Sequence, residues 1–140
     1  MVITVILTAT AVLIGWNYVR LHRFERDYEF PGLFGGRRYE CRLGGLRSEH
    51  RVLCFIGSDM SGIYLLPHPK ANRRFLGCQI GEDVFKKSIL IPWTDIHCRS
   101  GRGFFKHNIR FDIPPRKIFL YVPRDIGEKL LTDAGRGVPE

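Results

Sequence analysis

The first nineteen residues, 1–19, constrain this chain most, because they contain no charged side chain. A helix of that length rises about 1.5 Å per residue and measures roughly 28 Å, close to the roughly 30 Å hydrocarbon core of a bilayer. An apolar helix without a polar face also has no core large enough to bury it in so short a chain. The sequence therefore predicts an N-terminal transmembrane helix that tethers one small domain.

A cleaved secretory signal peptide is the main alternative for this segment. No Lys or Arg precedes the apolar run, and Trp16 and Tyr18 stand where small residues would form a cleavage site. These two aromatic residues favour the headgroup layer, and Arg20, Arg23 and Arg26 follow them directly. By the positive-inside rule, we expect an uncleaved single pass through the cell (inner) membrane, with the N-terminus outside and the C-terminal domain in the cytoplasm.

Small residues recur along one side of the predicted membrane helix. Thr4, Thr8, Ala11 and Gly15 share a face at helical spacing. Stripes of this kind let two membrane helices approach closely, so we expect another membrane protein as a partner. Alternatively, these residues are only tolerated in lipid and pack against nothing.

The chain is basic, with a formal net charge of +8 and a sequence pI near 9.7. Beside a membrane helix, this charge fits the anionic cytoplasmic leaflet better than nucleic acid, because no platform of interleaved basic and aromatic residues is evident. A solvated basic surface without a ligand is the alternative. We expect weak contact with anionic lipids, no nucleic acid, and membrane-surface contacts from Arg20, Arg23, Arg26, Lys70, Arg73 and Arg74.

The cysteines carry no recognisable metal or redox motif. Cys41, Cys54, Cys78 and Cys98 form no C-x-x-C pair and follow no regular spacing, so they fit reduced cytosolic thiols. His97-Cys98 is the only place where two His or Cys residues are adjacent in the sequence. The sequence therefore predicts neither a metal nor a cofactor.

Composition divides the chain into four parts. Residues 1–28 form the transmembrane and juxtamembrane helix, 29–50 a basic glycine-rich linker, 51–136 the cytoplasmic domain and 137–140 a tail. A short strand at 37–43 is the alternative for part of the linker.

Apolar periodicity predicts a small antiparallel sheet in the domain. Segments 51–56 and 63–66 are expected to form one hairpin, and 105–113 and 118–122 another. The apolar density of 88–96 predicts a buried strand, and 75–80 gives a weaker strand signal. In the clearest strand, Phe105, His107, Ile109, Phe111 and Ile113 alternate with polar residues and are expected to face the core. Pro92 is expected to mark a bulge, an edge position or the exit of its strand from the ladder, and 125–134 to form a closing amphipathic helix.

Short antiparallel strands closed by one C-terminal helix resemble the pleckstrin-homology-like (PH-like) superfold, including GRAM and bacterial PH-like domains. The segments Gly62-Ile63-Tyr64-Leu65 and Ile89-Leu90-Ile91-Pro92-Trp93-Thr94-Asp95-Ile96 carry this resemblance, and the chain also looks like small bacterial membrane proteins with one N-terminal span. The expected fold is mainly β (α+β), a bent sheet or split barrel capped by the C-terminal helix. In this superfold, lipid-binding members use basic residues around the first hairpin, whereas 58–61 here is Ser-Asp-Met-Ser.

Two functional classes follow from these features. The leading hypothesis is a non-catalytic, membrane-anchored interaction module, since the sequence contains no G-x-S-x-G, P-loop, H-E-x-x-H or G-x-G-x-x-G motif. The alternative is a membrane-tethered enzyme that uses Asp95, His97 and Cys98, which lie close together in sequence.

Overall fold

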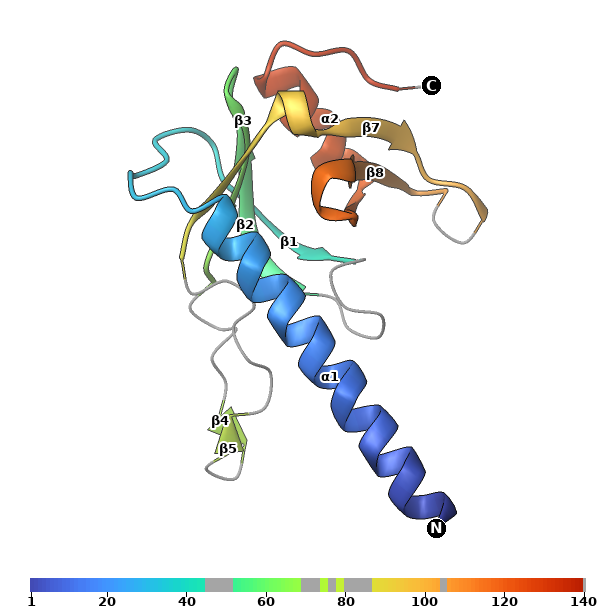
Figure 1. The fold of residues 1–140 in the computed structure, drawn as a ribbon. Helices are drawn as coiled ribbons and strands as arrows, with labels where there is room; N and C mark the ends of the chain where they lie inside the picture. The colour runs from blue at the N-terminus through green and yellow to red at the C-terminus, as the bar shows by residue number, and fades with distance from the viewer. Residues whose placement is uncertain (45–51, 69–73, 76–77, 80–86, 104–105, 140) are drawn as a thin grey trace.

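The computed structural model describes residues 1–44, 52–68, 74–75, 78–79, 87–103 and 106–139. A long helix, α1, runs from Val2 to Asp27, and its N-terminal part extends away from a compact β unit (Figure 1). Lys70, Arg73 and Phe105, which the sequence singles out, lie outside the described residues, as do residues 45–51.

The first sheet has four antiparallel strands in the order β1-β2-β3-β6. They are β1 (Tyr39–Leu43), β2 (Val52–Ser58), β3 (Gly62–Leu66) and β6 (Ile89–Pro92). Two short strands between β3 and β6, β4 (Arg74–Phe75) and β5 (Cys78–Gln79), pair with each other. The predicted hairpin of β2 and β3 is confirmed.

The second sheet has the order β7-β8-β9 and is also antiparallel. It consists of β7 (His97–Ser100), β8 (Asn108–Ile113) and β9 (Ile118–Pro123). A 3-10 turn, η2 (Trp93–Asp95), leads from β6 into β7, so the chain leaves the first sheet at Pro92, which is one of the three roles expected for this proline. A second 3-10 turn, η4 (Pro114–Arg116), joins β8 to β9 and completes the other predicted hairpin.

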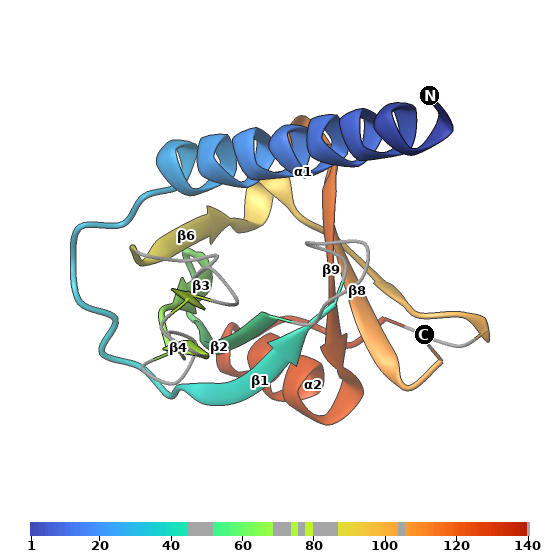
Figure 2. The ribbon, with the colours of Figure 1, turned by 90° about the horizontal axis from the view of Figure 1, so that it is seen from below.

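A backbone bridge joins the two sheets on their other side. Gly44 and Tyr121 exchange two hydrogen bonds, of 3.1 and 3.0 Å, which link the end of β1 to β9. The seven strands therefore curve around one interior, as Figure 2 shows from below. The mainly β class with two antiparallel sheets and a C-terminal helix is confirmed.

The closing helix α2 (Arg124–Asp133) packs on β8, β9 and β2. Its buried Gly127 lies against Ile109, where an added Cβ would approach the Ile109 side chain to 2.9 Å. The glycine lowers helix propensity by about 1 kcal/mol relative to alanine, and the close contact with β8 explains why it is there.

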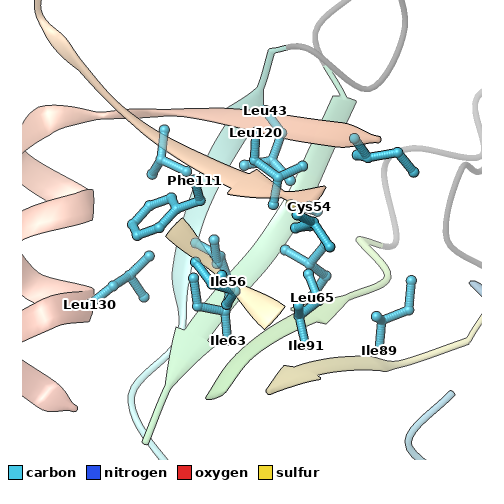
Figure 3. Close-up of a cluster of buried hydrophobic side chains, with 14 of the residues drawn as sticks. Leu43, Cys54, Ile56, Ile63, Leu65, Ile89, Ile91, Phe111, Leu120 and Leu130 are labelled. Atoms are coloured by element: carbon cyan, nitrogen blue, oxygen red, sulfur yellow. The ribbon is translucent and has the colours of Figure 1, made fainter. Parts of the chain in front are cut away.

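Apolar side chains from both sheets and α2 meet in one core, and Figure 3 shows them pointing toward one another. Ile109, Phe111 and Ile113 of β8 are fully buried, as their period-two pattern predicts. The inward position expected of His107 is wrong: this residue precedes β8 and is exposed, because the ladder begins at Asn108.

The segment 29–44, which the sequence indicates to be a linker, is attached to the β unit at Phe34 and along β1. Tyr39–Leu43 pairs along its whole length with β2, in agreement with the alternative of a strand at 37–43. Phe34 stacks on Tyr64 at 4.3 Å between ring centroids and covers the outer face of β3. Gly57 makes this possible, since a Cβ there would overlap the Phe34 ring. The folded unit therefore begins well before residue 51.

Across the residues that the structure describes, we find no helix whose length and apolar character suffice to cross a membrane. The structure therefore does not support the predicted transmembrane helix.

Candidate functional site

The N-terminal part of α1, as far as Val12, is exposed and mainly apolar. Seven large apolar residues there are each at least 58% exposed: Met1, Val2, Ile3, Val5, Ile6, Leu7 and Val12. The hydroxyls of Thr8 and Thr10 donate to the carbonyls of Thr4 and Ile6 at 2.7 Å. This back-bonding meets the hydrogen-bonding needs of both hydroxyl protons without water, so this part of the helix suits an apolar environment.

The predicted stripe of small residues lies partly on this surface. Thr4 and Thr8 line one shallow depression along α1, together with Val5, Ala9 and Val12. Ala11 is exposed on the same helix. Gly15 and Arg20 lie in the part of α1 whose side chains are outside the description.

The C-terminal end of α1 is firmly attached to the β unit. Phe24 and Tyr28 are 1% and 9% exposed, and their rings meet edge to face with centroids 5.3 Å apart. The Tyr28 hydroxyl donates to Asp95 Oδ2 at 2.8 Å, and Arg116 Nη1 contacts Asp27 Oδ2 at 2.9 Å. Burial, followed by the hydrogen bond to Asp95, raises the pKa of Tyr28 to about 12. These contacts fix the direction in which α1 leaves the domain.

The basic residues predicted to meet a membrane surface are brought together only in part. Arg23 and Arg26 are exposed on α1 beside the docked Phe24. Arg74 lies in β4, and the β4–β5 hairpin extends from the sheets toward the same side as the N-terminal part of α1 (Figure 1).

The three residues of the enzyme hypothesis do not converge on one site. Asp95 accepts the hydrogen bond from Tyr28 and so helps to hold α1. His97 and Cys98 are neighbours in β7, where successive side chains point to opposite faces, and only His97 is exposed. Burial raises the pKa of the Cys98 thiol to about 11, which disfavours the thiolate that a nucleophile needs.

Within the described ranges, no cluster of three or more His, Cys, Asp or Glu side chains has an arrangement that could hold a metal ion. Cys41 and Cys54 lie opposite each other on β1 and β2, are buried, and are free thiols. Their mutual hydrogen bond and the burial raise the pKa of Cys54. Both behave as small core residues.

A basic hollow on the outer face of the second sheet was not anticipated from the sequence. It has a volume of about 400 Å³ and is lined by His97, Arg99, Arg110, Asp112, Pro114, Lys117, Ile118 and Phe119. We call it the β7–β9 hollow. Its residues come from all three strands and from the turn between β8 and β9.

Asp112 organises the arginines of the β7–β9 hollow. Its Oδ2 lies 2.9 Å from Arg99 Nε, and its Oδ1 lies 2.6 Å from Arg110 Nε. The Arg110 guanidinium also sits over the Phe119 ring, 4.2 Å from the centroid, and donates to the Tyr121 hydroxyl at 3.2 Å. Arg110 is therefore fixed on several sides, whereas Arg99 remains 59% exposed.

Only part of this hollow had a signal in the sequence. The outward positions of β8, Arg110 and Asp112, follow from the alternation of that strand. The positions of Arg99 and Lys117 beside them depend on the pairing of β7 and on the turn, which periodicity does not specify.

Comparison of the chain with known protein families, with curated proteins and with solved structures finds no match.

Proposed function

We propose that this protein is a membrane-anchored, non-catalytic interaction module. In this proposal, a PH-like domain is held at the inner face of the cell membrane, where it contacts a protein partner or the anionic lipid surface. The observation that carries the proposal is the exposed apolar surface of residues 1–12, which belongs to a helix that continues without a break to an end fixed on the domain.

The apolar surface of α1 supports insertion into a bilayer. Isolated exposed apolar residues are ordinary on soluble proteins, but a contiguous apolar surface marks a contact with a membrane or another protein. Here the exposed residues occupy much of 1–12, which contains no charged side chain. Arg23 and Arg26 follow near the domain, where an anionic headgroup layer would attract them.

The strand arrangement supports the PH-like part of the proposal. A four-stranded and a three-stranded antiparallel sheet around one core, closed by a C-terminal helix, match the architecture that the resemblance implies. In the connection between β2 and β3, the Asp59 carboxylate accepts from Ser61 N at 2.8 Å and from Tyr64 Oη at 2.9 Å. This acidic, internally bonded turn is a poor site for a phosphoinositide, so lipid contact there would be unselective.

Selectivity would then come from a protein partner in the membrane. The surface of Thr4 and Thr8 on α1 is the place where a second membrane helix would pack. Replacing Gly15 with Leu is expected to lower the recovery of a membrane protein that co-purifies with the full chain, because the larger side chain separates the helices.

Extraction of membranes with alkaline carbonate tests the anchor. We expect the full chain to stay in the membrane pellet, and Ile6→Lys combined with Val12→Lys to release it, because each Lys costs about 2.5–3.5 kcal/mol near the centre of an inserted helix. Leu33→Lys is the matched control, since Leu33 is 94% exposed but lies outside α1. Release of the unmodified chain by carbonate would refute membrane anchoring.

A reporter fusion tests the orientation. Alkaline phosphatase joined to the C-terminus should be inactive, because the enzyme needs an oxidising compartment for its disulfides. An active fusion would place the domain outside the cytoplasm and contradict the proposed location.

A further inference from the structure

We infer that the β7–β9 hollow is a binding site for a compact phosphate group, such as a phosphomonoester. The hollow shares no residue with the α1 surface used in the proposed function. The inference adds to that proposal a ligand chemistry for the domain. The inference rests on the charge, the shape and the backbone of the hollow.

The charge balance of the hollow favours an anion with two negative charges. Three permanent cations line it, Arg99, Arg110 and Lys117, and Asp112 is the one carboxylate among the lining residues. Three positive charges and one negative charge leave a net charge of +2. A phosphomonoester carries about −1.5 to −2 near neutral pH, which matches this excess.

The shape of the hollow favours a small ligand over an extended chain. Its cations come from β7, β8 and the β8–β9 turn, and they converge on one space instead of following a single strand. Pro114, Ile118 and Phe119 supply its apolar lining. The volume of about 400 Å³ is within the usual range for small-molecule sites.

The Arg110 guanidinium is held in position before any ligand binds. Contacts with Asp112, Phe119 and Tyr121 fix it, so little side-chain entropy is lost when it donates to an anion. Arg99 contacts Asp112 through one nitrogen, Nε, and its side chain remains largely exposed. Guanidinium groups are well suited to bidentate recognition of phosphate.

The backbone at Lys117 is an independent sign of a functional role. Lys117 has a φ of 53°, and it is the one residue other than glycine with positive φ in the part of the chain described. Such a conformation is strained for a residue with a Cβ, and glycine would avoid this strain. A glycine at this position would lose the positive charge that Lys117 places at the edge of the hollow.

The hollow lies next to the end of α1. Arg116, the residue before Lys117, contacts Asp27 at 2.9 Å, and its guanidinium lies 5.7 Å from the centre of the Tyr28 ring. A phosphomonoester could therefore reach the hollow from solution or from a lipid headgroup beside the anchor.

Thermal unfolding of the full chain in detergent micelles tests the site with inorganic phosphate as the probe. Phosphate should raise the Tm relative to chloride at equal ionic strength, because a ligand that binds only the folded state stabilises it. Arg99→Gln and Lys117→Asn should each weaken phosphate binding by roughly tenfold, since each removes a charge-assisted interaction. Asparagine is chosen because it tolerates positive φ.

Two further variants make the test specific. Asp112→Asn should bind phosphate several times more tightly, because it removes the negative charge that opposes the anion while its amide oxygen can still accept from Arg110 Nε. Arg42→Gln is the matched control, since Arg42 is an exposed arginine on β1, outside the hollow. Its phosphate response should equal that of the unmodified chain.

Nanodiscs distinguish the two sources of phosphate. The Tm is measured in phosphatidylcholine discs with and without phosphatidic acid, whose headgroup is a phosphomonoester. A rise with phosphatidic acid that needs Arg99 and Lys117 assigns a lipid ligand, and a response to free phosphate alone assigns a soluble one. Either result supports the site.

Other results overturn the inference. No phosphate response from either source, or an equal response in Arg99→Gln and Lys117→Asn, would show that the hollow is not a phosphate site. A response to polyglutamate, but not to phosphate, that depends on both residues would assign an acidic peptide instead. The micelle experiment does not depend on membrane anchoring, so its failure is distinct from failure in the carbonate extraction.

Discussion

Replacing Phe24 with Ala tests whether the end of α1 belongs to the folded unit. The Phe24 side chain is 1% exposed and contacts the Tyr28 ring edge to face. Loss of a buried Phe side chain costs about 3–5 kcal/mol, of which roughly 0.5–1.5 kcal/mol is the ring pair. If α1 were only a tether, the same substitution would change the free energy of unfolding by less than about 0.5 kcal/mol.

Urea unfolding of the full chain in micelles measures this difference. Trp93 is largely buried, and a Trp16→Phe background leaves it as the only tryptophan that reports on unfolding. With a typical denaturant dependence, a loss of 3–4 kcal/mol lowers the urea midpoint by about 2 M. This loss is a large part of the roughly 5–15 kcal/mol that stabilises a domain.

The control is Leu33→Ala, which truncates an apolar residue that is 94% exposed in the segment after α1. Its urea midpoint should match that of the unmodified chain. Equal midpoints for Phe24→Ala and Leu33→Ala would refute the reasoning and return the end of α1 to the role of a tether.

Three further predictions concern the packing and the titrating groups. Gly127→Ala should lower the Tm, because overpacking against Ile109 costs about 1–3 kcal/mol and outweighs a helix-propensity gain of about 1 kcal/mol. An unchanged or raised Tm would contradict the close contact between Gly127 and Ile109. Tyr28→Phe should lose about 1 kcal/mol with the Asp95 hydrogen bond, as judged by urea unfolding at neutral pH. Because the folded state raises the pKa of Tyr28 from 10.0 to about 12, the stability linked to its protonated phenol is full below pH 10 and is lost as the pH rises through 12. Stability measured between these pH values should therefore fall less steeply in Tyr28→Phe than in the unmodified chain. The Cys98 thiol should react slowly with iodoacetamide at pH 8 until the chain is unfolded, because its pKa is raised to about 11; rapid modification of the native chain, detected by mass spectrometry, would contradict its burial.

The sequence by itself determined the elements whose signals are local. The alternation in β8 identifies its buried face, since side chains of a strand point to opposite sides in turn. The helical spacing of Leu130, Leu131 and Ala134 identifies α2. Gly57 and Gly62 bracket the connection between β2 and β3, so that hairpin was also predictable.

Only the tertiary structure decided which distant segments meet. The sequence indicates a juxtamembrane helix around Phe24 and a linker around Phe34. Both side chains are nevertheless buried, because each joins a hydrophobic cluster of residues that are distant in the sequence. The β7–β9 hollow combines Arg99, Arg110 and Lys117 through strand register and one left-handed residue. Periodicity reports the face on which a side chain lies but not its neighbours across the sheet, which long-range pairing sets.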